Sequence, residues 1–313
     1  MTGAVGMIGL GIMGSAMAGN LLAAGFRVVG CDVVPAARKA LARQGGVAVA
    51  SAGAVARRAD VAITSLPSVA ALDAVAADLA GAARRGLVVV ETSTLPIEAK
   101  ERARRALARA GATLLDCPLS GTGAQARTRD LAVYASGPRP AYRRVIPVLE
   151  GFARAHYHVG PFGAGSRMKF VANLLVAIHN VAAAEAMTLA LKAGLDPAQV
   201  LKVIGDGAGS SRMFQVRGPM MVANDYSEAT MKVAVWQKDM RIIGEFAAAL
   251  DCPTPLFAAS APIYNAAMAS GHALDDTASV CAVLEAMAGI ERRTPRPAAR
   301  RRARGSGPVP KKG

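Results

Sequence analysis

A glycine-rich turn near the N-terminus constrains the fold more than any other feature of the chain. The apolar run Ala4–Ile8 leads into Gly9-Leu10-Gly11-Ile12-Met13-Gly14, and a helix-forming segment follows from Ser15 to Leu22. This order predicts a strand, a tight turn and a helix. In such units the first glycine makes the turn, the second lets the backbone approach a pyrophosphate, and the third lets the helix pack closely on the strand. The sequence therefore predicts a dinucleotide site at the helix N-terminus, formed by Gly9, Leu10, Gly11, Ile12, Met13 and Gly14.

Asp32 indicates which dinucleotide binds. The segment 27–31 is typical of a second strand, and Asp32 follows it close to the roughly 20-residue spacing expected for an acid that binds the adenosine ribose. A carboxylate accepts hydrogen bonds from both ribose hydroxyls of NAD but repels the 2′-phosphate of NADP. The next residues carry no cation, although Arg38 and Lys39 could reach back from the following helix. We expect NAD, with NADP as the alternative.

Strand and helix patterns alternate through the first half of the chain. This alternation predicts an α/β fold with a mostly parallel sheet, covered by helices on both faces. The further strand candidates are 60–66, 87–91, 112–117, 131–136 and 155–159. Ligands bind beyond the carboxyl ends of such strands. The segments expected at the ligand edge are therefore Leu66-Pro67-Ser68, Thr92-Ser93-Thr94 and the turn from Pro118 to Gly123.

The chain becomes helical after Gly163. The segment 166–193 predicts one helix of about 28 residues, close to 42 Å long at 1.5 Å per residue. It is apolar on most faces, which predicts burial between domains or subunits, and hence a homodimer or homotetramer. Later helical candidates begin at Pro197 and cover 232–250, 255–270 and 274–289. We expect a Rossmann-like, doubly wound domain over residues 1–162 and an all-α domain over residues 163–290.

Lys169 and Asn173 lie four residues apart within the long predicted helix, so their side chains share a face. A cation beside an amide can polarise and hold a small oxygenated anion, which is typical of an enzyme. Most helical lysines are solvated surface residues, but Lys169 lies between Met168 and Phe170 in a segment with few other charges. Asn173 considered alone could equally be a helix-interior amide bonded to the backbone.

The composition permits two domains and indicates no membrane segment. Hydrophobic residues make up 52% of the 313 residues, enough for one large core or two. The N-terminal apolar stretch lacks a basic region before it and is interrupted by glycines, unlike a signal peptide. Cys31, Cys117, Cys252 and Cys281 are scattered without paired spacing, so neither a zinc site nor a disulfide framework is expected. These features fit a cytoplasmic protein without a bound metal.

The basic charge is concentrated at the C-terminus. Residues 291–313 carry nine Lys or Arg against one Glu, which is +8 of the total net charge of +15. The segment is rich in Pro, Arg and Gly, so it cannot bury enough apolar surface to offset its ordering entropy and is expected to be disordered. We expect a solvated extension; contact with nucleic acid or an acidic partner is the alternative.

Several motifs in order along the chain resemble those of the beta-hydroxyacid dehydrogenases, within the 6-phosphogluconate dehydrogenase superfamily. The resemblance covers about residues 4–290. It depends on the glycine-rich turn continuing into Met17-Ala18-Gly19-Asn20-Leu21, and on these further motifs: Leu66-Pro67, Ser93-Thr94, Asp116-Cys117-Pro118-Leu119-Ser120-Gly121, Gly163-Ala164-Gly165, Lys169, Asn173 and Lys238-Asp239. Members include 3-hydroxyisobutyrate dehydrogenase and tartronate semialdehyde reductase.

The resemblance implies a role for each matching residue. Lys169 matches the catalytic residue, Ser120 and Gly121 match positions that hold the substrate carboxylate, and Asn173 matches one that positions the substrate. Leu66, Pro67, Thr94 and Lys238 match cofactor contacts. The implied activity is NAD-dependent hydride transfer to or from a small 3-hydroxy acid, similar to 3-hydroxyisobutyrate, or its semialdehyde.

The chain departs from the family pattern at two places that concern the substrate. The turn is Ser120-Gly121-Thr122-Gly123, where many relatives have two adjacent glycines after the serine. Asn173 is followed by Leu174, where many relatives have a second polar residue. Asp239 could belong to an ordinary exposed ion pair with Lys238, so it is not counted among the site residues.

Two other functions remain open at the level of sequence. An NADP-dependent glyoxylate, succinic semialdehyde or imine reductase would share the fold, although imine reductases of this superfamily usually lack the lysine that Lys169 matches. A non-catalytic dinucleotide sensor, with a basic tail that binds nucleic acid, belongs to a different class. No helix-turn-helix or aromatic-basic surface supports the sensor.

Overall fold

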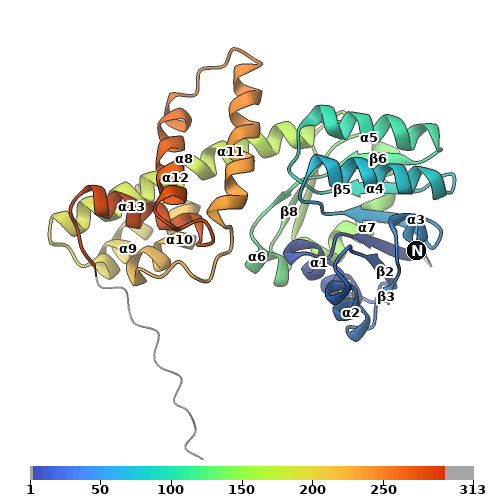
Figure 1. Cartoon of the computed structure of the whole chain (residues 1–313), viewed down its shortest axis with the longest axis horizontal. Helices are drawn as coiled ribbons and strands as arrows, with labels where there is room; N and C mark the ends of the chain where they lie inside the picture. The colour runs from blue at the N-terminus through green and yellow to red at the C-terminus, as the bar shows by residue number, and fades with distance from the viewer. Residues whose placement is uncertain (1–2, 293–313) are drawn as a thin grey trace, which may run out of the picture.

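A six-stranded parallel sheet organises the first half of the chain (Figure 1). The computed structural model describes residues 3–292. The strands of this sheet are β1 Ala4–Ile8, β2 Val28–Cys31, β3 Val47–Ala48, β4 Ala59–Thr64, β5 Val88–Glu91 and β6 Thr113–Asp116. They lie in the order β3-β2-β1-β4-β5-β6, and every neighbouring pair is parallel. This doubly wound order confirms the predicted Rossmann-like fold.

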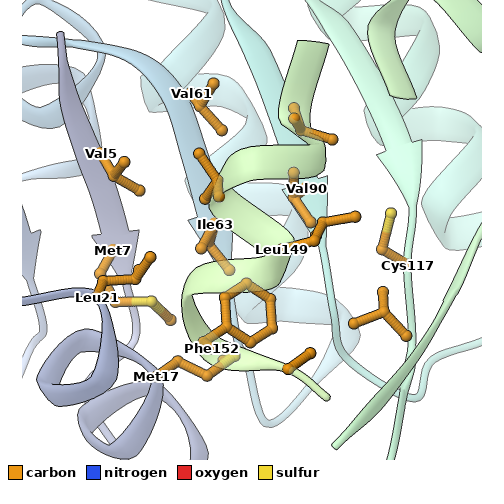
Figure 2. Packing of buried hydrophobic residues seen from close by; sticks show 14 of the residues in the cluster. Val5, Met7, Met17, Leu21, Val61, Ile63, Val90, Cys117, Leu149 and Phe152 are labelled. Atoms are coloured by element: carbon orange, nitrogen blue, oxygen red, sulfur yellow. The ribbon is translucent and has the colours of Figure 1, made fainter. Parts of the chain in front are cut away.

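Helices cover both faces of the sheet. They are α1 Ile12–Ala23, α2 Pro35–Arg43, α3 Ala52–Ala56, α4 Val69–Ala82, α5 Ile97–Arg109 and α7 Arg139–Phe152. Side chains alternate along each strand, so Val5 and Met7 of β1 belong to one core layer and Ile8 to the other. Figure 2 shows the first layer, in which β1 and β4 pack against α1 and α7 through Val5, Met7, Val61, Ile63, Met17, Leu21, Leu149 and Phe152. On the opposite layer, α3, α4 and α5 supply the apolar side chains.

Two predicted strands form a separate sheet. Strands β8 (Ala132–Ala135) and β9 (Ala155–His158) are parallel to each other, and β7 (Leu119–Ser120) pairs antiparallel with β8. An antiparallel bridge between Asp116 and Ser136 connects this small sheet to β6. The chain turns back immediately after β6, so β7 and the short helix α6 (Gly123–Arg127) lie beyond the carboxyl edge of the main sheet.

The helical region is arranged around α8 (Ala164–Lys192), which starts two residues before the predicted boundary and extends away from the sheet (Figure 1). Around it lie α9 Pro197–Gly205, α10 Arg212–Ala223, α11 Val233–Ala248, α12 Pro255–Ala269, the 3-10 turn η1 Thr277–Ser279 and α13 Val280–Met287. Their buried side chains form a second hydrophobic core. This confirms the predicted all-α C-terminal part.

Within residues 3–292, α8 is the one helix with the length and hydropathy to cross a membrane. Its most apolar window is 44% buried against other parts of the fold, as in the core helix of a compact domain. Another part of α8 is exposed in the single chain and is also apolar, including Val171, Leu175 and Leu189. The helix is therefore buried on one face rather than all round.

The predicted basic tail lies almost entirely outside the described residues. Arg292, inside the segment expected to be disordered, forms an ion pair with the buried Glu285. Its guanidinium also donates to the carbonyl oxygens of Met221 and Val222. The expectation for residues 293–313 is therefore neither supported nor opposed by the fold.

Candidate active site

The glycine-rich turn lies between the ends of β1 and β4, the two strands at which the sheet order reverses. Gly9 has a φ of +87°, and a Cβ there would lie 2.2 Å from the carbonyl oxygen of Ser65. A Cβ at Gly14 would lie 1.8 Å from the carbonyl oxygen of Gly9, so only glycine allows α1 to start this close to the strand. A Cβ at Gly11 would meet nothing within 4 Å. The turn is therefore tight toward the protein and open toward the ligand edge.

Asp32 lies beside this turn, at the end of β2. Its carboxylate accepts hydrogen bonds from the backbone N–H groups of Leu10 (2.6 Å) and Val34 (2.7 Å). Arg38 does reach back from α2, but its guanidinium donates to the backbone carbonyl oxygen of Asp32 at 2.5 Å rather than to the carboxylate. Lys39 is exposed. The carboxylate is thus fixed in place next to the phosphate-binding turn.

These features fit a dinucleotide. The space at Gly11 leaves room for a pyrophosphate at the N-terminus of α1, and Asp32 is one strand away, where an adenosine ribose would lie. The strand order reverses between β1 and β4, and ligands of such sheets bind beyond the carboxyl ends of the strands at that point. The segments expected at the ligand edge lie at this same edge of the sheet.

The loops after β4 and β5 are joined at this edge. The backbone N–H of Leu66 donates to Ser93 Oγ at 2.8 Å. Pro67 follows at an exposed position, and Thr94 follows Ser93 at a half-buried one. Lys238 of α11 donates to the carbonyl oxygen of Thr94, so the helical region contacts the loop after β5 directly.

Lys169 lies on the second turn of α8 and is half-buried. Burial lowers the pKa of its ammonium group to about 8; the charge of Lys238 lowers it further, and the carboxylate of Asp239 opposes both. A lysine with such a pKa exchanges protons near neutral pH, which an exposed lysine with a pKa near 10.4 does not. The structure thus gives Lys169 a property expected of an acid–base group.

One hydrogen bond and one ion pair connect Asn173 to Lys238 through Asp239. Asn173, 4% exposed, donates through Nδ2 to Asp239 Oδ2 at 3.0 Å, and Asp239 Oδ1 lies 3.1 Å from Lys238 Nζ. Asp239, which the sequence suggested to be part of an ordinary exposed ion pair, is instead buried at 4% exposure. Its spacing from Trp236 and Ile243 was the available signal, because positions three and four apart on a helix share a face.

Ser120 and Gly121 lie at the end of β7, in a different part of the site. Gly121 has a φ of +134°, which favours glycine. Pro118, at the start of the same turn, lies close to α8, since a Cβ at Gly165 would be 3.1 Å from its Cδ. The altered turn also reaches the cofactor edge, because a Cβ at Gly123 would lie 2.4 Å from a methyl carbon of Ile12. The structure thus links the Ser120 turn to α8 and to the glycine-rich turn, without a direct hydrogen bond from Ser120 to Lys169.

Two family models match the chain, one after the other. Residues 4–160 match the NAD binding domain of 6-phosphogluconate dehydrogenase. Residues 163–284 match the model described as NAD-binding of NADP-dependent 3-hydroxyisobutyrate dehydrogenase. The matches show a nicotinamide dinucleotide cofactor and leave the choice between NAD and NADP open.

Curated and solved relatives cover nearly the whole chain. It is 36% identical over 291 residues to an L-threonate dehydrogenase of Cupriavidus necator, which spans 92% of this chain and 97% of that protein. It is 32% identical over 288 residues to the 2-hydroxy-3-oxopropionate reductase of Escherichia coli, covering 91% and 98%. The solved 3-hydroxyisobutyrate dehydrogenase of Salmonella typhimurium has a TM-score of 0.82 at 32% identity, covering 90% of this chain and 99% of that one.

These relatives are named as dehydrogenases of hydroxy acids or as a reductase of an oxo acid, and the solved relative shares the fold found here. The chain is accordingly a hydroxy-acid oxidoreductase, and it belongs to the beta-hydroxyacid dehydrogenase family.

Proposed function

We propose that the chain is an NAD-dependent dehydrogenase of a small 3-hydroxy acid, similar in size to 3-hydroxyisobutyrate, or works in reverse on the semialdehyde. The observation that carries the proposal is Lys169, whose pKa burial lowers to about 8 at the start of the helix that faces the cofactor edge. A proton-exchanging lysine at that place suits removal of a proton from an alcohol.

In the oxidation, the neutral amine of Lys169 accepts the hydroxyl proton as the C–O bond becomes a carbonyl. A nicotinamide dinucleotide held by the glycine-rich turn and Asp32 would supply the hydride acceptor for the oxidation and the hydride donor for the reverse reaction. In the reduction, the Lys169 ammonium donates its proton to the carbonyl oxygen. Protons and electrons balance in both directions without another reactant.

The remaining residues position the reactants. Asn173, held by Asp239, positions the substrate one helical turn after Lys169. Ser120 and Gly121 supply a hydroxyl and a backbone N–H for the substrate carboxylate. Lys238 fixes Thr94 and so the loop beside the nicotinamide. We divide the chain for these roles into residues 1–162, which bind the cofactor, and residues 163–290, which complete the site.

NAD is proposed as the cofactor because the carboxylate of Asp32 lies at the ribose position. The guanidinium of Arg38 donates to the backbone carbonyl of Asp32 and not to its carboxylate, so the carboxylate oxygens remain directed by the N–H groups of Leu10 and Val34. A 2′-phosphate would therefore be placed next to an anion.

The test is turnover of purified protein, followed through nicotinamide absorbance. NAD and NADP are compared on 3-hydroxyisobutyrate, glycerate, threonate and 3-hydroxypropionate, and the reduced cofactors on the semialdehydes, glyoxylate and a cyclic imine. We expect NAD-dependent oxidation of one acid. Turnover confined to NADPH with glyoxylate, succinic semialdehyde or the imine would favour the reductase alternative instead.

Lys169→Ala should abolish turnover while NAD affinity, measured by calorimetry, stays within about threefold, since the lysine lies on α8 and the phosphate turn precedes α1. Lys192→Ala, at the other end of α8, is the matched control and should leave the rate unchanged. Wild-type turnover that survives in Lys169→Ala would remove the lysine from the mechanism. Cofactor binding without turnover on every compound would favour the sensor.

A further inference from the structure

A fully buried lysine that the proposed reaction does not use lies between the cofactor edge and α8. Lys100 of α5 is 0% exposed, and its Nζ contacts Ser93 O at 2.6 Å, Glu91 Oε2 at 2.7 Å and Asp116 Oδ1 at 2.8 Å. Burial alone would lower the pKa of Lys100, but the carboxylates of Asp116 and Glu91 outweigh it and raise the pKa. The amine is therefore charged at neutral pH and acts through its contacts.

On one side, the cluster fixes the loop after β5. Lys100 binds the carbonyl oxygen of Ser93, and Glu91 Oε1 accepts from the N–H of the same residue at 3.0 Å. Ser93 Oγ in turn accepts from Leu66 N. The carbonyl oxygen and the N–H of Ser93, the residue before Thr94, are thus both held in place, the first by Lys100 and the second by Glu91.

On the other side, the cluster fixes the first turn of α8. The N-cap residue of α8 is Gly163, which has no side chain to cap the helix. Asp116 supplies the missing acceptor from β6: its carboxylate accepts from the N–H and from the hydroxyl of Ser166, both at 2.8 Å. Ser166 lies three residues before Lys169, so Asp116 fixes the turn that carries the proposed catalytic lysine.

We propose that Lys100, Glu91 and Asp116 form a positioning cluster that sets the separation between the loop beside the nicotinamide and Lys169. The inference rests on the proposed function. Its physical basis is that one cation holds two carboxylates, each of which binds a different side of the site. Without the cation, the buried carboxylates of Glu91 and Asp116 repel each other. The loop after β5 and the first turn of α8 are then both displaced.

Lys100→Met tests the cluster most directly, because it keeps the length of the side chain and removes the charge. Glu91→Gln is the milder variant, which retains Lys100 opposite Asp116 and keeps the test open if Lys100→Met does not fold. The matched control is Arg217→Met, which breaks another buried ion pair, with Asp276 at 3.2 Å, inside the helical region.

We expect kcat of Lys100→Met to fall about ten- to a hundredfold, the usual result of a misplacement near 1 Å. KM for NAD should stay within about threefold, and the deuterium isotope effect on kcat should rise as hydride transfer becomes slower. Glu91→Gln should lose severalfold in kcat. Arg217→Met should lower the midpoint of thermal unfolding without altering kcat of the folded enzyme or its isotope effect.

Amide hydrogen exchange of the cofactor-free protein gives a second readout that needs no turnover. In Lys100→Met, peptides covering residues 92–96 and 163–170 should both exchange faster, and neither should change in Arg217→Met. Faster exchange confined to α5, with kcat and isotope effect as in wild type, would show that the cluster only stabilises the fold. Inactive wild-type protein would overturn the proposed function, while the exchange data would still decide the coupling of loop and helix.

Discussion

At the scale of single residues, the site depends on how charges around Lys169 balance. Lys238 lowers its pKa and Asp239 raises it, although these two residues are adjacent in the sequence and in contact with each other. Desolvation is the larger effect and lowers the pKa to about 8. Because the two neighbours act in opposite directions, removing Lys238 and removing Asp239 should shift the pKa of Lys169 in opposite directions.

The pH dependence of the rate should report this balance. Oxidation requires neutral Lys169, so kcat/KM for oxidation should rise with pH through a midpoint near 8, and kcat/KM for reduction should fall through the same midpoint, because kcat/KM reports the groups of the free enzyme. Asp239→Asn removes the group that raises the pKa and should shift both midpoints to lower pH. Lys238→Gln should shift them to higher pH. Stopped-flow rates between pH 6 and 10 measure the shifts, and movement in one direction for both variants would contradict the assignment.

Asp32 should decide cofactor selectivity. Asp32→Ala would remove the two hydrogen bonds proposed to the ribose and should weaken NAD about ten- to a hundredfold, at ~1.5–3 kcal/mol for bonds to a charged acceptor. NADP should weaken less, because the repulsion of its 2′-phosphate disappears. Asp60→Ala, at a half-exposed position near the amino end of β4, is the control and should change neither affinity. Calorimetric titration measures both, and a wild-type preference for NADP would show that the ribose site was misinterpreted.

Asp239 marks the limit of residue-by-residue prediction. The types and spacing of Lys169 and Asn173 were enough to select them, because both project from one helix face. The partner of Asn173 comes from α11, 66 positions later. The spacing of Asp239 from Trp236 and Ile243 places it on the buried face of α11, but it does not show that this face packs against Asn173. The pairing of Asn173 with Asp239 depends on how α8 and α11 pack, which the three-dimensional structure shows.

At the scale of elements, the unit β1–α1 combines two kinds of glycine. Gly14 permits close packing of helix on strand, whereas Gly11 leaves space for the ligand. Gly11 has φ −70° and ψ −162°, an extended backbone that alanine also adopts. Alanine at these two positions should therefore have different consequences.

Gly14→Ala should destabilise the protein by at least about 1–3 kcal/mol, since its Cβ would overlap the backbone of Gly9. Gly11→Ala should unfold at the wild-type temperature but bind NAD at least about tenfold more weakly, a loss of ~1.4 kcal/mol. Calorimetric unfolding and NAD titration separate the two effects. Equal loss of stability in both variants would mean that Gly11 is also needed for packing.

Element order was largely predictable, and the assignment of strands to sheets was not. Glycine signals and apolar runs gave β1, β2, β4, β5 and β6, because each is a buried strand with a recognisable boundary. Strand β3 has two residues, Val47 and Ala48, and is therefore too short to show the pattern of a strand in the sequence. Strands β8 and β9 were expected, but their placement in a second sheet depends on the reversal at Cys117-Pro118, which periodicity does not report.

At the scale of the whole molecule, charge pairing between distant residues explains why Lys100 is buried, which the local sequence does not indicate. Lys100 stands in a segment with Arg102, Arg104 and Arg105, which resembles a solvated basic face. It is buried because Glu91 and Asp116 meet it from two neighbouring strands. A lysine in a basic stretch of sequence can therefore be the buried partner of two carboxylates.

The exposed apolar face of α8 leads to a prediction about assembly. Val171, Leu175 and Leu189 are 56%, 47% and 72% exposed on one helix that also supplies Lys169. Apolar residues repeated over about 27 Å of helix, at 1.5 Å per residue, are costly to leave in water, and a second copy of the chain would cover them. We expect a homodimer or homotetramer in solution rather than the 32.0 kDa monomer.

Sedimentation equilibrium measures the assembly directly. Val171→Asp with Leu175→Asp should shift the mass toward 32.0 kDa, because two carboxylates would be desolvated in the interface. Leu250→Asp, at an equally exposed apolar position just after α11, should leave the mass unchanged. If the wild-type chain sediments as a monomer, the face of α8 is not an interface between copies. If the double variant dissociates and also loses turnover, the partner copy is needed to hold the α8 turn that carries Lys169.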